Sequence, residues 1–341
     1  QTSNKGIEIA LQCVLVKTRD WNVTAGFNIN FNRGKVDKLA DNVTGLYGTE
    51  WATSSTFPKS DYVLKEGRPV GLVRGLTADG FYTTDDFTYE NGVYTLKEGV
   101  ADVSSAVFPN YHLHNGINER PAGQLAYPGM AKFKDLNDDG IINDDDVDVI
   151  GDMTPVHTGG FNINATYKNF DLGLYFNWSY GNEIYNVNKL AALYGYKEGA
   201  VYENKLSIVK DCYKIYDVVN GELVALTTPE QLNAANANAK LPLAYSENGY
   251  VSTLGIEDGS YLRLNTLTLG YTLPKSILQK AGISNLRVYG SIYNVFTITG
   301  YSGIDAEVST STSTKTYPQL GMDWGTYPRA RSFVLGVNLS F

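Results

Sequence analysis

Hydrophobic and polar residues alternate one by one along several stretches of the chain. Residues 21–32 place Trp, Val, Ala, Phe, Ile and Phe at every second position, with Asn, Thr or Gly between them. Residues 161–167 and 170–180 repeat this pattern and leave only Lys168 and Asn169 for a turn. Because strand side chains point to alternate faces, the pattern predicts antiparallel strands with one apolar and one polar face.

The same alternation recurs often enough to predict a large sheet. The predicted strands are residues 6–16, 21–32, 161–167, 170–180, 266–273, 286–297 and 333–341. Their polar positions carry mainly Asn, Thr, Ser and Gly, whereas a sheet surface in bulk solvent usually carries Lys, Glu and Arg. Small neutral polar side chains are typical of a wall that lines a water-filled lumen. The pattern therefore favours an all-β fold, an antiparallel transmembrane β-barrel segment.

The connections between these strands are alternately short and very long. Residues 17–20 and 168–169 form short turns, whereas residues 34–158 and 183–257 are interpreted mainly as long loops, with no separate domain. Short turns at one end and long external loops at the other are the layout of an outer-membrane barrel. Further candidate elements are strands within 68–82 and 124–134, a helix at 229–239, a helical turn after Pro274 and an exposed Ser/Thr-rich loop at 309–314.

One of these loops, DLNDDGIINDDD, has the spacing of a single-cation site. Positions 1, 3, 5, 7, 9 and 12 are Asp135, Asn137, Asp139, Ile141 (through its carbonyl), Asn143 and Asp146, and Gly140 is at position 6. Calcium takes six to eight oxygen ligands, which one compact loop of this kind supplies. Position 12 is Asp where an EF-hand has Glu, which resembles a dockerin-type loop, but no helix pattern flanks it and no second copy exists. We predict a structural Ca²⁺ that braces the loop; the alternative is a solvated acidic turn.

The last strand ends on an aromatic residue. One face carries Phe333, Leu335, Val337, Leu339 and Phe341. Gly336, Leu339 and Phe341 fit a Gly-x-x-apolar-x-aromatic spacing, which resembles the signal by which outer-membrane barrels are assembled. Val334 stands where that signal usually has a polar residue. The alternative is an ordinary sheet strand whose last residue is Phe.

Composition narrows the possible partners. The formal net charge is −8 and no basic run occurs, which argues against a nucleic-acid partner. No run of 18 apolar residues exists, so a transmembrane helix is excluded, whereas barrel strands need only about 9–11 residues. Cys13 and Cys212 define no disulfide framework. Because a strand pattern starts within a few residues of Gln1, we interpret the chain as the C-terminal piece of a longer one.

Catalytic signatures are absent from the sequence. There is no nucleophile elbow, no phosphate-cradling glycine loop and no His-Glu-x-x-His motif. His112 and His114 lie two residues apart without a third ligand nearby, so we interpret them as ordinary loop residues. We therefore predict that the chain is not an enzyme.

Segments spread along the chain resemble a known family. They are NKGIEIAL at 4–11, FKDLNDDGIINDDD at 133–146, the stretch 149–186, the stretches 258–278 and 286–308, and RARSFVLGVNLSF at 329–341. These segments resemble the C-terminal barrel half of SusC/RagA-type TonB-dependent transporters. The resemblance implies an outer-membrane importer of oligosaccharides or peptides that works with a SusD-like lipoprotein. It also implies a larger barrel, whose plug and TonB-recruiting segment would lie before Gln1.

A soluble or surface-anchored, Ca²⁺-stabilised β-sandwich that binds carbohydrate is the competing hypothesis. It explains the alternation and the acidic loop, but not the terminal aromatic strand or the alternately short and long connections, and it predicts shorter strands with more charge on their outer faces. The two hypotheses therefore differ in where Phe27, Leu174 and Leu335 point. A closed protein interior around these side chains would contradict the importer. The aromatic residues that contact substrate cannot be assigned from the pattern.

Overall fold

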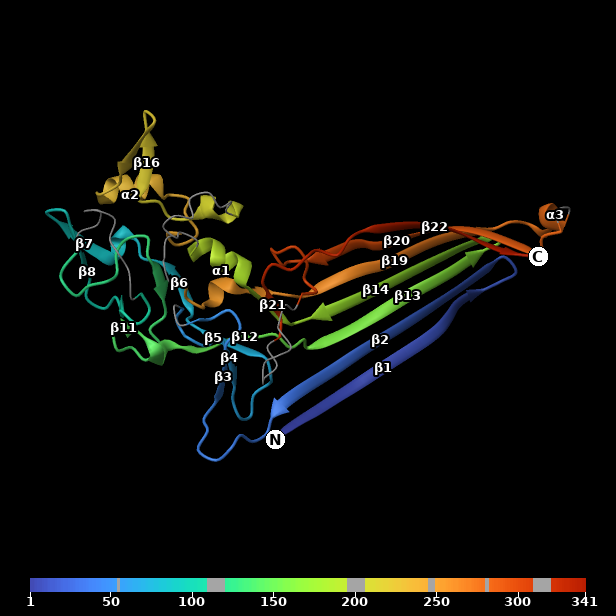
Figure 1. Ribbon diagram of the computed structural model, residues 1–341, viewed down its shortest axis with the longest axis horizontal. Helices are drawn as coiled ribbons and strands as arrows, with labels where there is room; N and C mark the ends of the chain where they lie inside the picture. The colour runs from blue at the N-terminus through green and yellow to red at the C-terminus, as the bar shows by residue number, and fades with distance from the viewer. Residues whose placement is uncertain (54–55, 109–119, 195–205, 245–248, 280–281, 309–319) are drawn as a thin grey trace.

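The computed structural model describes residues 1–53, 56–108, 120–194, 206–244, 249–279, 282–308 and 320–341. Its largest element is a seven-stranded antiparallel sheet in the order β1-β2-β13-β14-β19-β20-β22 (Figure 1). The strands are β1 Thr2–Lys17, β2 Trp21–Val36, β13 His157–Tyr167, β14 Phe170–Tyr180, β19 Tyr261–Thr272, β20 Asn285–Thr299 and β22 Ser332–Ser340. All seven strands predicted from the alternation are confirmed.

The register of the sheet divides it into an apolar and a polar face. Residues directly opposite each other on paired strands lie on the same face. One such row across six strands is Leu11, Phe27, Phe161, Phe176, Leu264 and Phe296. A neighbouring row across all seven strands is Gln12, Gly26, Asn162, Tyr175, Thr266, Tyr293 and Ser332. Apolar residues are therefore paired with apolar residues from strand to strand, as the sequence predicts.

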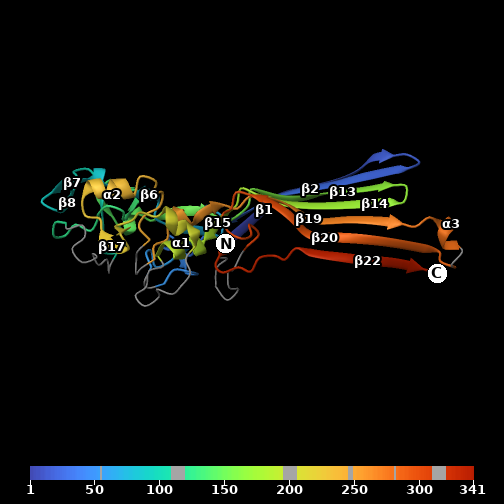
Figure 2. The same ribbon diagram turned by 90° about the horizontal axis from the view of Figure 1, so that it is seen from above.

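No other sheet covers the apolar face within the described part of the chain. Figure 2 shows the seven strands as a single layer. Leu335 is 89% exposed and Phe27 is 40% exposed, while Leu174 is half-buried between its neighbours in the sheet. A closed protein interior around these side chains, which would contradict the importer, is not found among the described residues. Exposing this much apolar surface to water is unfavourable by about 25 cal/mol per Å², so the face requires an apolar environment.

The short turns lie at one end of the sheet. The backbone N–H of Thr18 donates to the carbonyl of Trp21 over 2.8 Å, and that of Lys168 donates to the carbonyl of Asp20 over 2.8 Å. Lys168 adopts φ +51°, which a two-residue hairpin turn requires. Adjacent turns are thus hydrogen-bonded to each other, which fixes the end of the sheet.

The long connections fold together into a body at the opposite end of the sheet (Figures 1 and 2). Its strands are β3 Leu46–Gly48, β4 Tyr62–Leu64, β5 Leu72–Gly75, β6 Ala78–Phe81, β7 Phe87–Glu90, β8 Val93–Leu96, β9 Asp102–Val103, β10 Ala131–Phe133, β11 Ile141–Ile142, β12 Asp148–Asp152, β15 Glu183–Asn186, β16 Tyr216–Val219, β17 Glu222–Ala225, β18 Ile256–Asp258 and β21 Met322–Asp323. Its helices are α1 Val187–Tyr194 and α2 Pro229–Ala235, whereas α3 Lys275–Leu278 lies at the short-turn end.

The body contains the hydrophobic core of the chain. Fully buried side chains such as Leu76, Tyr82, Leu190 and Val251 come from the connections after β2 and after β14, and Met322 comes from the connection after β20. The two segments that the sequence pattern interprets mainly as loops therefore build one core, together with the connection after β20. The predicted helix at 229–239 is present but ends at Ala235, with Thr228 as its N-cap. The predicted loop at 309–314 and the histidines at 112 and 114 lie outside the described residues.

Helices do not provide a membrane crossing in the described structure: none is both long and apolar enough to span a bilayer.

Candidate functional site

The polar face of the sheet is the first candidate for contact with a passing solute. Its side chains bond mainly to one another: the Tyr175 hydroxyl donates to Asn164 Oδ1 over 3.1 Å, and Thr268 and Ser291 share a hydrogen bond of 2.8 Å. Arg287 pairs with Asp171 near the short turns, with Nε donating to Oδ1 over 2.9 Å. These side chains thus bond to one another across neighbouring strands of the polar face.

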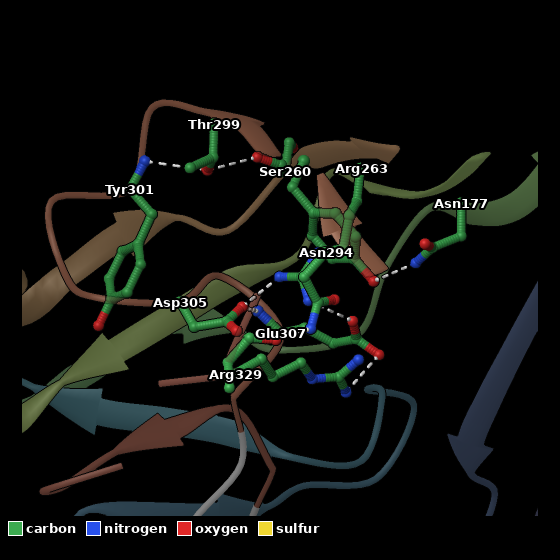
Figure 3. Close-up of polar contacts among 11 residues, drawn as sticks. Asn177, Ser260, Arg263, Asn294, Thr299, Tyr301, Asp305, Glu307 and Arg329 are labelled. Carbon is green, nitrogen blue, oxygen red and sulfur yellow. Dashed lines mark hydrogen bonds and ion pairs between the residues drawn. The ribbon is translucent and has the colours of Figure 1, made fainter. Parts of the chain in front are cut away.

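A cluster of ion pairs lies where the polar face meets the body (Figure 3). The Arg263 guanidinium on β19 is 2% exposed; it pairs with Asp305 and, through Nη1, with Glu307 over 3.4 Å. Arg329 pairs with Glu307 over 2.9 Å. Asp305 and Glu307 come from the connection after β20, so the cluster fastens that connection across the end of the sheet. The sequence analysis did not predict it; the only signal was a single Arg among neutral residues on the polar face of a strand.

A cleft opens beside this cluster, between four segments of the chain. It is lined by residues 186–192 at α1, by residues 206–208, by the turn at 302–304 and by residues 323–326, and its volume is about 510 Å³. The Tyr301 hydroxyl donates to Asp323 Oδ2 over 2.6 Å and so ties the turn to β21. Burial and the nearby Asp323 carboxylate raise the pKa of Tyr301 well above its usual value, so its hydroxyl stays a donor. This hydrogen bond therefore holds the turn and β21 together on one side of the cleft.

Glu257 secures the same region from the side of β18. Its carboxylate accepts from the Ser302 backbone N–H over 2.9 Å and pairs with Lys189 over 3.1 Å. Burial alone would raise the pKa of Glu257, but the hydrogen bonds from Ser302 and the pairing with Lys189 lower it overall. Glu257 is thus held ionised, and it joins α1 to the turn at 302–304.

The acidic loop is a compact turn held together by hydrogen bonds from its own backbone to its Asp side chains. Asp135 accepts from the backbone N–H groups of Asp139 (3.2 Å) and Gly140 (2.7 Å), and Gly140 adopts φ +85°. Asp146 is completely buried and accepts from the N–H groups of Leu136 (2.7 Å) and Asn143 (2.8 Å), which closes the loop. Within the described residues, no group of three or more His, Cys, Asp or Glu side chains converges to hold a metal ion. The calcium site predicted from the spacing therefore stays a prediction.

The remaining predicted ligands of that site lie on the same loop. Asn137 Oδ1 accepts from the N–H of Asp139 over 3.2 Å, and Asp139 Oδ1 accepts from the N–H of Ile141 over 2.9 Å. The Asn143 amide donates to the Ile141 carbonyl over 3.2 Å. All six positions are thus brought into one turn, although their oxygen atoms bond mainly to the loop's own backbone.

The residues of the predicted assembly signal lie on the outermost strand of the sheet. Leu339 is 47% exposed on the apolar face of β22, and Phe341, one residue past the end of this strand, is 88% exposed. Gly336 pairs with Tyr289 on the polar face, and a Cβ atom there would lie 2.3 Å from the Tyr289 ring. A larger residue at this position would therefore require the Tyr289 ring to move. Whether the spacing also acts in assembly stays a prediction.

Neither Cys13 nor Cys212 forms a disulfide, and the two side chains lie in different environments. Cys13 is exposed on the apolar face of β1, whereas Cys212 is buried in the body. Burial, and then the neighbouring Asp211 carboxylate, raise the pKa of the Cys212 thiol to about 11. Neither cysteine forms part of the clusters described above.

Two known proteins match this chain over nearly its whole length. No protein-family model matches the chain. TonB-dependent receptor P3 of Formosa agariphila is 29% identical over 346 residues, which cover 100% of this chain and 29% of that protein. TonB-dependent receptor SusC of Bacteroides thetaiotaomicron is 26% identical over 345 residues, which cover 99% of this chain and 26% of that protein.

A solved structure also matches the fold of this chain over its whole length. The RagAB peptide transporter matches with a TM-score of 0.65 at 21% identity, over 100% of this chain and 29% of the matched chain. The chain thus spans less than a third of the length of each of these relatives. The large antiparallel sheet is accordingly a β-barrel segment. The chain matches, from end to end, a stretch of a SusC/RagA-type TonB-dependent receptor.

Proposed function

We propose that the chain forms part of an outer-membrane importer, TonB-dependent and SusC-like, that takes up oligosaccharides or peptides together with a SusD-like surface lipoprotein. In this proposal the chain has a transport role and no catalytic one, and it does not bind nucleic acid. The observation that supports it most is the uncovered apolar face that runs without interruption across all seven strands. Hydrocarbon is the environment in which such a face is stable.

The spacing of aromatic residues on that face also supports a membrane location. Trp21 and Tyr167 pack with ring centroids 4.4 Å apart at the short-turn end, and Phe170 and Tyr271 continue the row. Ten residues along β13, His157 stacks on Tyr180 with centroids 5.0 Å apart. Ten residues span about 33 Å along a strand. At a tilt of about 40° this gives a height of about 25 Å, the apolar band that aromatic girdles flank in outer-membrane barrels.

Fractionation tests the location. We expect the complete polypeptide that contains this chain to sediment with outer membranes and to require detergent for extraction. A monodisperse preparation in detergent-free buffer would refute the importer, because the apolar face would then be stable in water. Uptake of labelled oligosaccharides or peptides by cells that express the polypeptide, with and without the lipoprotein, tests the partnership.

We also propose that the loop 135–146 binds one Ca²⁺ as a structural ion in an external connection. Each carboxylate oxygen of Asp135 and Asp139 that accepts one N–H retains a lone pair for an ion. Replacing both residues with Ala should abolish any protection that Ca²⁺ gives this loop against protease, while a variant of Asp217 on the exposed β16–β17 hairpin should keep it. Equal protection in the double variant would refute the site.

Finally, we propose that Gly336, Leu339 and Phe341 contribute to an assembly signal. Because Phe341 is 88% exposed and packs against little else, Phe341→Ser should leave the folded structure intact but reduce the amount assembled in the outer membrane. Normal assembly of this variant would refute the proposed assembly signal and leave the assignment of the fold unchanged.

A further inference from the structure

A second hollow lies within the body, and two basic side chains line it. They are Arg74 on β5 (Figure 1) and Lys59 in the segment between β3 and β4. Residues 105–107 and Asp144 form other parts of the lining, and the volume is about 450 Å³. Small-molecule sites usually have volumes of about 300–1,000 Å³, so the hollow is large enough for a small organic ligand.

Arg74 lacks the carboxylate partner that other shielded arginines of this chain have. Arg263 and Arg287 each pair with carboxylates. Arg74 is half-buried, and its guanidinium lies over the ring of Tyr47, 4.8 Å from the ring centre. Its one side-chain hydrogen bond to a described residue runs from Nη1 to Ser60 Oγ over 2.8 Å. Because a guanidinium has five N–H donors, most of its donors are left for a ligand.

The lining carries more positive than negative charge. Arg74 and Lys59 contribute two positive charges and Asp144 one negative charge, which gives a net charge of +1 in a chain whose formal net charge is −8. Asp144 acts on Arg74 electrostatically but forms no ion pair with it in the described structure. Burial lowers the pKa of Arg74, because the charged form loses hydration there. Lys59 is exposed and forms no ion pair with any described residue. The hollow therefore holds two cations that its own fold leaves without a bonded counter-charge.

We propose that this hollow binds the carboxylate group of a small monoanionic molecule. A guanidinium can donate two parallel N–H bonds to the two oxygens of a carboxylate, which an ammonium cannot do. Ser105 is exposed in the lining, and its hydroxyl can donate a further hydrogen bond to the same group. The Asp144 carboxylate repels a second negative charge, so a monoanion is favoured over a dianion. The site goes beyond the proposed importer and does not depend on it, because every residue it uses belongs to the body.

Calorimetric titration of the complete polypeptide in detergent tests the proposal. The probes are N-acetyl-leucine and an N-acetylated tripeptide that ends in leucine, each compared with its own C-terminal amide. An acid and its amide have almost the same shape but differ in charge. We expect at least one of the two acids to bind and its amide to bind at least about tenfold more weakly, since a hydrogen bond to a charged group contributes about 1.5–3 kcal/mol. Binding of N-acetyl-leucine would identify a free small acid as a sufficient ligand, whereas binding of the tripeptide alone would identify a peptide end.

Variants of the lining assign the binding to this hollow. Arg74→Gln should raise the Kd of the acid at least about tenfold and leave the affinity for the amide unchanged, while Arg74→Lys should restore only part of the loss. Arg68→Gln is the matched control: Arg68 is exposed and lies outside the lining, so this change should alter the Kd less than about twofold. If Arg74→Gln lowers the melting temperature, Lys59→Gln supplies the test at an exposed position, with an expected rise in Kd of about threefold.

Three results would overturn the proposal: neither acid binds, acid and amide bind equally well, or Arg68→Gln weakens binding as much as Arg74→Gln does. The importer is judged separately, by fractionation. A polypeptide found in the outer membrane whose acid binding ignores the variants of Arg74 and Lys59 leaves the importer standing and removes only this site. A polypeptide that is soluble without detergent removes the importer, whatever it binds.

Discussion

A lysine placed on the apolar face tests whether that face meets hydrocarbon or water. Phe333 on β22 is 71% exposed and pairs with Ile292, in the row that includes Leu174 and Ile163. This row lies four residues, or about 13 Å, along β13 from the aromatic Tyr167. It is therefore near the middle of the apolar band. Val334, its neighbour in sequence, lies on the polar face and provides a matched control.

The two environments predict effects of different size. In hydrocarbon, Phe333→Lys should cost about 2–4 kcal/mol, the value for Lys near a bilayer midplane, which lowers the folding equilibrium constant roughly 30- to 800-fold. In water, a substitution at so exposed a site should change stability by no more than about 0.5 kcal/mol. Val334→Lys should stay within that smaller range in both cases. The high exposure of Phe333 matters here, because little protein packing is lost with the ring.

The assay is urea titration of the complete polypeptide assembled in lipid vesicles. The fraction still assembled is measured from electrophoretic mobility without heating, because assembled and unfolded barrels migrate differently. The expected result is a lower midpoint for Phe333→Lys and an unchanged midpoint for Val334→Lys. Equal midpoints for the two variants would refute the assignment of the faces. A larger effect at Val334 would reverse it.

Two further predictions concern the body end of the sheet. Arg263→Ala leaves the Asp305 and Glu307 carboxylates without their buried partner, so we expect a local loss of about 3–5 kcal/mol and faster proteolysis of the connection after β20; cleavage at the wild-type rate would show that the cluster does not fasten this connection. Because the folded-state pKa of Glu257 lies below its usual 4.5, its stabilising contribution is present above pH 4.5 and is lost as the pH falls through the lower value. Melting temperatures measured from pH 7 downwards should therefore fall more steeply below pH 4.5 in the wild type than in Glu257→Gln; parallel profiles would contradict the role of the Glu257–Lys189 pair.

The sheet could be predicted from the sequence because its signal is local and repeated. In β2 and β14 every second side chain is apolar over 11 or more residues, and no tertiary contact is needed to see this. The register follows from the same pattern, since a slip of one residue would move every apolar side chain to the polar face. The two-residue turn at Lys168 and Asn169 fixes the pairing of β13 with β14 in the same way.

The core of the body could not be predicted because its signal is neither local nor periodic. Its strands are two to five residues long, too short for alternation to be recognised, and buried residues such as Leu76 and Val251 meet only after the chain has folded. The ion-pair cluster could not be predicted for the same reason, because Arg263 and Asp305 are 42 residues apart in the sequence. The acidic loop, by contrast, was located from spacing alone, and its compact turn is present, while its ion is still a prediction.

Spin-label accessibility at Cys13 measures the environment of the apolar face most directly. The label is attached to the native Cys13, and in a second protein to Gln12→Cys with Cys13→Ser, so that adjacent residues of β1 report on opposite faces; Cys212 is buried and, with a thiol pKa of about 11, should not react. In vesicles of the complete polypeptide, the label at Cys13 should collide more often with dissolved oxygen than with a water-soluble nickel complex, and the label at position 12 should show the reverse. Greater nickel accessibility at Cys13 would contradict the placement of this face in hydrocarbon.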